Sequence, residues 1–144
     1  MIIRNAQPKD FDAIKELQKI GVLTFGAGSD AEISFSDIDL QNQIDAQRGI
    51  VLVAEQNNKI IAFVFGENFV NPTWAMGSYF TVHPDFRGTD VYKKIMDAFA
   101  ARVKENGGKY LVLYADSQNP RLVNFYKRFG FVAGETFVEM IKEL

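Results

Sequence analysis

The sequence predicts an α/β fold of the α+β kind, in which a mixed central sheet is flanked by helices. Residues 74–115 have the pattern of a strand, a helix and a second strand, and such a crossover implies two parallel strands joined with right-handed geometry. Residues 50–66 have the pattern of an antiparallel hairpin. The predicted order is β-α-α-β-β-β-α-β-α-β-β, and 144 residues suit a single domain over 1–144.

The N-terminal part is predicted to contain one strand and two helices. Residues 2–5 form the strand, and Pro8 opens a helix whose apolar residues recur at helical spacing until Gly21. Residues 21–35 contain three glycines and indicate a loop. Ser36 can then cap a second helix that ends at Gly49.

Three strands are predicted next. Strands at 50–55 and 59–66 are joined by a turn at Asn57-Asn58, and a third strand spans 74–82.

The C-terminal part is predicted to alternate helices and strands. A helix over 90–105 carries the apolar stripe Val91, Ile95, Phe99 and Val103. The nearly all-apolar run 109–115 indicates a strand buried on both faces. The remaining elements are expected to be a helix over 119–129 and two short strands at 131–135 and 136–142.

Composition and charge exclude several classes of function. A net charge of −2 argues against a general nucleic-acid binder, and the absence of cysteine with a single histidine argues against a metal site. The N-terminal residues lack the layout of a signal peptide. The longest apolar run, Ile60 to Phe65, is too short to span a bilayer. We therefore expect a cytoplasmic protein that binds neither nucleic acid nor membrane.

Two motifs and the element order resemble the GNAT superfamily of acetyl-CoA-dependent N-acetyltransferases. The first motif is "VHPDFRG", which runs into a helix at 82–88. The second is "NPRLVNFYKRFGF" at 119–131, which resembles the family pattern N-x-x-A-x-x-x-Y-x-x-x-G-F with Leu122 in place of alanine. The resemblance covers essentially the whole chain and implies acetyl-CoA as the co-substrate.

The loop that binds the cofactor diphosphate in this family departs from its pattern here. The family's Q/R-x-x-G-x-G/A falls on the residues Arg87, Gly88, Thr89, Asp90, Val91 and Tyr92, so Arg87 matches but Asp90 and Tyr92 replace small residues. Asp90 could act as an N-cap and accept hydrogen bonds from the amides of residues 92 or 93. Two negative charges at this place would weaken diphosphate binding by roughly 1–4 kcal/mol, and Lys93 and Lys94 would offset part of that loss.

The resemblance also implies a path for the pantetheine chain of the cofactor. In the family this chain lies between two splayed parallel strands, which would place it beside Phe80, Thr81 and Val82, with Asn119 across the gap. Arg128, with Arg121 and Lys127, lies in an acid-free stretch that could meet the 3′-phosphate of the cofactor.

Two residues are expected to carry the chemistry. Tyr126 matches the position of the family's general acid. A phenol with a pKa near 10 can donate a proton to a leaving thiolate. Its alternative role is core packing on a stripe with Leu122, Val123 and Phe129. Glu67, at the end of the second hairpin strand, is the candidate general base, and its alternative role is that of an exposed charge at the strand end.

The acceptor side is acidic. Residues 21–47 contain five acids and no lysine or arginine, and the acids are Asp30, Glu32, Asp37, Asp39 and Asp45. In the family this segment walls the acceptor pocket, so a cationic small amine or protein amine is expected to bind there.

The leading hypothesis is direct transfer of an acetyl group from acetyl-CoA to a primary amine. The alternative is a GNAT-fold module for binding or regulation in which Asp90 and Tyr92 impair cofactor binding. The family's final strands often mediate dimers, so a homodimer is also expected.

Overall fold

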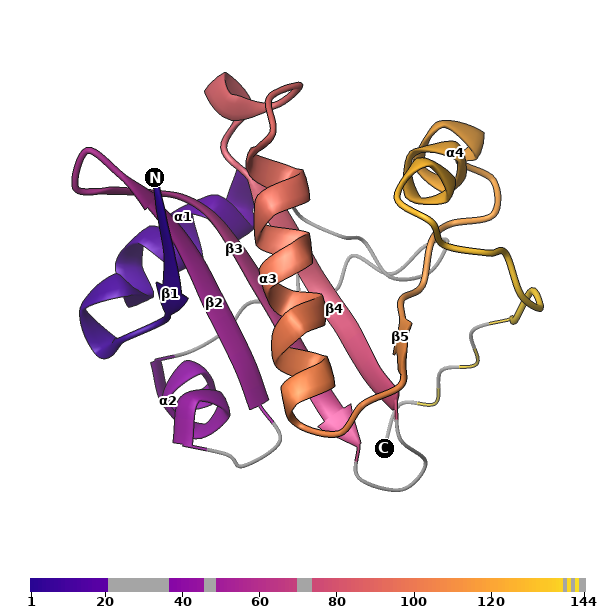
Figure 1. The fold of residues 1–144 in the computed structure, drawn as a ribbon, viewed down its shortest axis with the longest axis horizontal. Helices are drawn as coiled ribbons and strands as arrows, with labels where there is room; N and C mark the ends of the chain where they lie inside the picture. Colours follow the sequence, from indigo (N-terminus) through magenta and orange to yellow (C-terminus); the bar gives the residue numbers. More distant parts are fainter. Residues whose placement is uncertain (21–36, 46–48, 70–73, 139, 141, 143–144) are drawn as a thin grey trace.

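The computed structural model describes residues 1–20, 37–45, 49–69, 74–138, 140 and 142. Within them, one mixed sheet of five strands has the order β1-β2-β3-β4-β5 (Figure 1). The first four strands pair antiparallel, and β5 pairs parallel to β4. The strands are β1 (Ile2–Asn5), β2 (Gly49–Gln56), β3 (Lys59–Phe69), β4 (Trp74–Val82) and β5 (Tyr110–Val112).

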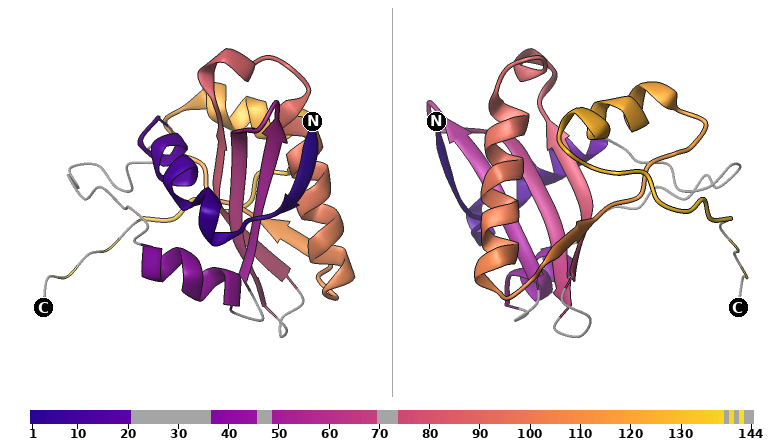
Figure 2. Two further views of the ribbon diagram at one scale, coloured as in Figure 1. Left: turned by 90° about the vertical axis from the view of Figure 1, so that its left-hand side faces the viewer. Right: turned by 45° about the vertical axis from the view of Figure 1, so that its right-hand side comes forward.

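Helices cover both faces of this sheet, with α1 and α2 on one face and α3 on the other (Figure 2). The 3-10 turns η1 and η2 precede α1 and α3. None of the described helices is long and apolar enough to cross a bilayer. The bounds are η1 (Pro8–Asp10), α1 (Phe11–Ile20), α2 (Asp37–Asp45), η2 (Pro84–Phe86), α3 (Val91–Glu105) and α4 (Pro120–Arg128).

The core lies on both sides of β2, β3 and β4 because successive residues of a strand point to opposite faces. On β2, Leu52 packs in the cluster beneath α3, whereas its neighbour Val53 packs in the cluster beneath α1 and α2. The predicted stripe on α3 is confirmed, since Phe99 is fully buried and its three partners are nearly so. The turn predicted at Asn57-Asn58 is also confirmed, with φ values of 52° and 60° at these two residues.

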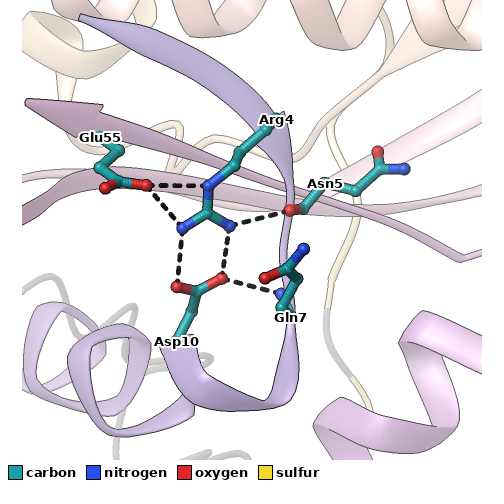
Figure 3. A network of polar contacts seen from close by, with 5 residues as sticks. All are labelled: Arg4, Asn5, Gln7, Asp10 and Glu55. Carbon is teal, nitrogen blue, oxygen red and sulfur yellow. Dashed lines mark hydrogen bonds and ion pairs between the residues drawn. The ribbon is translucent and has the colours of Figure 1, made fainter. Parts of the chain in front are cut away.

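A network of polar contacts around Arg4 ties β1 to β2 and to the turn η1 that precedes α1 (Figure 3). The Arg4 guanidinium donates to Asp10 at 2.7 and 2.9 Å and to Glu55 of β2 at 2.9 Å. The Asp10 carboxylate also accepts from the Gln7 amide at 2.8 Å. Burial acts to raise the pKa of Asp10, but these hydrogen bonds outweigh it and hold the pKa below its usual value.

Two of the predicted boundaries are wrong. The second helix ends by Asp45, and Gly49 begins β2 rather than ending the helix. The strand expected at 109–115 is reduced to β5, and it is not buried on both faces, because Tyr110 is 70% exposed. The expected loop at 21–35 and the Ser36 cap lie outside the described residues.

The two final strands, expected at 131–135 and 136–142, are absent from the part of this segment that the structure describes. After α4 the chain projects away from the sheet (Figure 2). Its apolar side chains have no core to enter, since Val132 is 92% exposed and Met140 is 87% exposed. A strand needs a neighbouring strand to satisfy its backbone, and no neighbour lies beside this segment in the described residues.

The Arg4 network predicts a stability contribution that depends on pH. The lowered pKa of Asp10 stabilises the fold above its unfolded value of about 3.9, and this stabilisation is lost as the pH falls through the folded value. We expect Asp10→Asn to lower the free energy of unfolding by roughly 2 kcal/mol at pH 7. Urea unfolding at pH 7 and near pH 3 measures this change.

The difference between wild type and Asp10→Asn should shrink at the lower pH. Asp12→Asn, which changes an exposed carboxylate nearby, is the matched control and should have little effect. A difference that stays constant with pH would show that the Asp10 charge does not contribute.

Candidate acyl-donor site

The parallel strands β4 and β5 stay together for three residues only. Their pairing covers Trp74 to Met76. Immediately beyond, a bulge occurs between β3 and β4, because Phe65 pairs with Tyr79 whereas Gly66 pairs with Gly77. A bulge increases the local twist and bends the strand. The chain after β5 diverges from β4 toward α4 (Figure 1).

Phe80, Thr81 and Val82 lie beyond this divergence. In the described residues they pair with β3 on one side and have no second strand on the other. Their side chains serve the core, since Thr81 is 5% exposed and Phe80 packs against Phe99 at 5.5 Å between ring centroids. The backbone of these residues is therefore the part that can meet a ligand. It offers donors and acceptors of an unpaired strand edge, except for the Val82 carbonyl, which accepts from Arg87.

The edge of β4 leads to the first turn of α3, where backbone amides are unpaired. None of the described residues accepts a hydrogen bond from the amide of Tyr92 or Lys93. Such amides attract anions.

Asp90 does not act as the side-chain cap that the sequence indicated. It is the N-cap residue of α3, but its carboxylate makes no capping hydrogen bond. The carboxylate instead pairs with Lys94 at 2.6 Å, one helical turn further on, and this hydrogen bond lowers the pKa of Asp90. The ion pair turns the carboxylate away from the amides and partly neutralises its charge, and the i,i+4 spacing of the two residues could have predicted it.

The loop before α3 is held by local contacts. Gly88 has a φ of 79°, a left-handed conformation that suits glycine. The Arg87 Nε donates to the Val82 carbonyl at 3.2 Å, and the Thr89 hydroxyl donates to the Phe86 carbonyl at 2.6 Å.

The side chains of Val91 and Lys93, in the first turn of α3, are engaged in other contacts. Val91 is buried in the core, and Lys93 pairs with Asp97 at 2.6 Å. The Val91 amide also donates to the Thr89 hydroxyl at 3.4 Å. Of these two positions, only Lys93 therefore leaves its backbone amide for a ligand.

Tyr92 joins an aromatic cluster that links α3 to α4. Its ring centroid lies 4.6 Å from that of Phe125 and 4.8 Å from that of Phe129, and 6.0 Å from that of Phe80. The sequence did not indicate this cluster, although the apolar residues of 119–129 and the bulk of Tyr92 were visible. Nothing in the sequence showed that the two helices would meet here.

Tyr126 lies beside this cluster on α4. Burial raises the pKa of Tyr126, and the nearby Tyr92 hydroxyl acts in the opposite direction. Burial also raises the pKa of Tyr92 strongly. The hydroxyls of Tyr92 and Tyr126 shift each other's pKa in opposite directions. The Tyr92 hydroxyl is buried without a hydrogen-bond partner in the described residues.

The alternative role of Tyr126 in core packing is met only in part. Its ring packs against Phe125 and Phe131, but no residue of α4 is fully buried. Leu122, Val123, Tyr126 and Phe129 are each partly exposed. Asn119 is the N-cap of α4, and its Oδ1 accepts from the Leu122 amide at 3.1 Å. This cap fixes the start of the helix that carries Tyr126.

The outer face of α4 is basic. The Arg128 guanidinium lies 5.8 Å from the centre of the Phe125 ring, which is within cation–π range. An open pocket of about 670 Å³ on this face is lined by Arg121, Asn124, Lys127 and Arg128.

Glu67 is not brought into contact with Tyr126 in the described structure. It lies on β3, is partly exposed, and faces Met76 of β4 next to the bulge. Of the acids predicted to wall an acceptor pocket, Asp45 is exposed at the end of α2. Asp30 and Glu32 lie outside the described residues, as do the side chains of Asp37 and Asp39.

Proteins of known structure or activity share this arrangement. A transcriptional regulator from Bacillus halodurans superposes with a TM-score of 0.81 at 20% identity, over 98% of this chain and 99% of that one. The aminoglycoside N-acetyltransferase AAC(6')-Iy in complex with CoA superposes with a TM-score of 0.80 at 19% identity, over 99% and 95% of the two chains. At this identity the likeness shows the fold alone.

Similarity in sequence identifies the family. A mycothiol acetyltransferase from Propionibacterium freudenreichii is 37% identical over 57 residues, which span 40% of this chain and 18% of that relative. The family model described as acetyltransferase (GNAT) family matches residues 16–131. With most of its length matched and the fold in agreement, the chain belongs to the GNAT family of acetyltransferases.

Proposed function

We propose that this protein transfers an acetyl group from acetyl-CoA to a primary amine in one direct step. The observation that carries the proposal is the open edge of β4, which leads to the unpaired amides at the start of α3. An extended amide chain can add to a strand edge, and a diphosphate can bind at a helix N-terminus. The two sites are continuous here and fit the two halves of coenzyme A.

The residues present fit acetyl-CoA despite the substitutions in the loop. The backbone of Phe80, Thr81 and Val82 would hold the pantetheine amides. The segment from Arg87 to Lys93, which contains Gly88, Thr89, Asp90, Val91 and Tyr92, would hold the diphosphate through the backbone amides that it leaves unpaired. The amides of Arg87, Thr89 and Val91 already donate hydrogen bonds within this region. The repulsion expected from Asp90 is reduced because Lys94 pairs with its carboxylate.

Two further contacts complete the proposed donor site. Asn119 would reach the pantetheine from across the gap, in addition to capping α4. Arg128 and its basic neighbours, which line the pocket on α4, would attract the 3′-phosphate.

Tyr126 is proposed as the general acid. Bound acetyl-CoA supplies a thioester carbonyl, at which a carbon–nitrogen bond forms as the carbon–sulfur bond breaks. The raised pKa keeps Tyr126 protonated at neutral pH, so its hydroxyl can donate to the departing sulfur. Glu67 is proposed to accept the surplus proton of the amine, through water, because it lies next to the bulge where β4 and β5 separate.

The acceptor is proposed to be a cationic amine, either a small molecule or an amine of a protein or peptide. The support is the run of acids between residues 21 and 47, of which Asp45 is exposed on α2. A negative surface raises the local concentration of cations.

A module that binds or regulates without acetyl transfer is the second candidate. The observation in its favour is the ring of Tyr92, which packs against Phe125 and Phe129 in a loop where the family pattern has a small residue. If this ring closed the cleft, acetyl-CoA would not enter.

We predict that acetyl-CoA raises the melting temperature of the protein. A ligand at a hundredfold excess over its dissociation constant stabilises by about 2.7 kcal/mol, which corresponds to a shift of roughly 5–10 °C for a chain of this size. Dephospho-CoA, which lacks the 3′-phosphate, is the matched control and should require higher concentrations. The absence of a shift at millimolar acetyl-CoA would support the second candidate instead.

If Tyr126 is the general acid, its substitution should lower kcat without changing the affinity for acetyl-CoA. Tyr126→Phe keeps the ring contacts with Phe125 and Phe131 but removes the acidic proton. We expect kcat to fall by about 100-fold or more, with little change in the affinity for acetyl-CoA. Steady-state kinetics with a panel of amines and a binding titration measure both quantities, and an unaltered kcat would remove Tyr126 from the mechanism.

The C-terminal segment supports a proposal of self-association. Its apolar side chains are exposed, and Phe137 and Val138 are 70% and 82% exposed. β5 is the last strand of the described sheet, and Val103, Tyr110 and Leu111 line a hollow beside it. Within the described residues, one chain thus carries both a strand edge without a neighbour and an exposed apolar segment that is in no sheet, although Phe137 lies 6.4 Å from Tyr114 between ring centroids. We propose that a second copy supplies the partner for each, in a twofold dimer.

This dimer is tested by the molar mass in solution. We expect light scattering to give twice the mass of one chain, and we expect Phe137→Glu with Val138→Lys to give monomers. Val132→Lys alone should weaken the dimer less. A wild-type protein that is monomeric at 100 μM would contradict the proposal.

A further inference from the structure

Tyr92 makes the aromatic contacts that join α4 to α3. Of the described aromatic pairs, those of Tyr92 with Phe125 and Phe129 connect the two helices. No residue of α4 is buried, so this cluster is a large part of what holds the helix in place. On the other side the Tyr92 ring contacts Phe80, whose own ring packs on Phe99 in the core. The ring of Tyr92 therefore connects α4 to the rigid part of the molecule.

The hydroxyl of Tyr92 is a buried polar group that no described residue satisfies. An unsatisfied buried hydroxyl is unfavourable, and in native proteins such a group calls for an explanation. Tyr126 belongs to the same group of rings, since Phe125 lies 4.6 Å from Tyr92 and 5.5 Å from Tyr126 between ring centroids. Tyr126 also contributes to the raised pKa of Tyr92. In enzymes, hydrogen bonds among catalytic groups are often long without substrate and shorten when the substrate binds.

We propose that Tyr92 is a positioning residue for Tyr126, whose ring fixes α4 and whose hydroxyl donates a hydrogen bond to the Tyr126 oxygen when the acyl donor binds. This inference rests on the proposed acetyltransferase reaction.

The arrangement makes chemical sense because a phenol has one proton and two lone pairs. When Tyr126 accepts from Tyr92, its own proton is free to point at the leaving sulfur. As the sulfur–hydrogen bond forms, the oxygen–hydrogen bond of Tyr126 breaks and leaves a phenolate. The hydrogen bond from Tyr92 stabilises that phenolate until water relays to it the proton that Glu67 accepted from the amine, so that both residues return to their starting states.

A double-mutant cycle tests the hydroxyl. Tyr92→Phe keeps the ring and the backbone amide, so it should lower kcat roughly tenfold, the effect of losing one hydrogen bond to a charged group. The KM for acetyl-CoA should change less than about twofold. In the Tyr126→Phe background the same substitution should have almost no further effect on kcat, because its action passes through the Tyr126 oxygen. Tyr114→Phe, at an exposed position outside the described strands, is the matched control.

Two outcomes would overturn the role of the hydroxyl. One is a Tyr92→Phe protein with the kcat of wild type. The other is an equal loss in both backgrounds, because that would show a structural effect independent of Tyr126. A wild-type protein inactive with every amine would refute the proposed function and, with it, this use of the hydroxyl.

The role of the ring is measured without any turnover. Hydrogen exchange of the α4 amides should be at least about tenfold faster in Tyr92→Leu than in wild type, and unchanged in Tyr92→Phe, while exchange in β2 and β3 stays the same. Equal protection of α4 in all three proteins would show that Tyr92 does not hold this helix, whatever the activity of the protein.

Discussion

The separation of β4 from β5 is the constraint on which the rest of the structure depends. The two strands pair through Met76 and then diverge at a bulge opposite Gly66. A sheet that stayed paired to the end of β4 would bury the backbone of Phe80, Thr81 and Val82, and no acyl donor could reach it. The divergence instead leaves a strand edge that leads to the first turn of α3. One local irregularity thereby creates both halves of the proposed donor site.

The same separation leaves α4 without support from the sheet, and the aromatic cluster compensates. Tyr92 replaces a small residue in a loop where small size favours a close approach to phosphate. In exchange, its ring reaches Phe125 and Phe129 and holds the helix that carries Tyr126. Asp90 is a second departure from the family pattern. Its ion pair with Lys94 reduces the repulsion that its carboxylate would exert on a diphosphate. The loop is therefore altered in its side chains while its free amides remain.

Much of the fold could be predicted because its signals are local. The stripe of α3, the hairpin at Asn57-Asn58 and the parallel crossover each follow from spacing over a few residues. The predictions that failed concern elements whose structure depends on neighbouring strands and helices. The apolar run 109–115 predicted a buried strand, but β5 diverges after Val112 and Tyr110 stays exposed. Two final strands were also expected after α4, yet a strand needs a partner edge. The pairing of Asp90 could have been found from its spacing to Lys94, whereas the meeting of Tyr92 with α4 depends on tertiary packing.

The account is tested most directly by following backbone amide resonances during a titration with acetyl-CoA. It predicts saturable shifts at the amides of Phe80, Thr81 and Val82 and at those of Tyr92 and Lys93, with one dissociation constant for all of them. Shifts confined to the basic face of α4, with the amides of β4 and α3 unmoved, would contradict it, because the cofactor would then bind without entering between the strands.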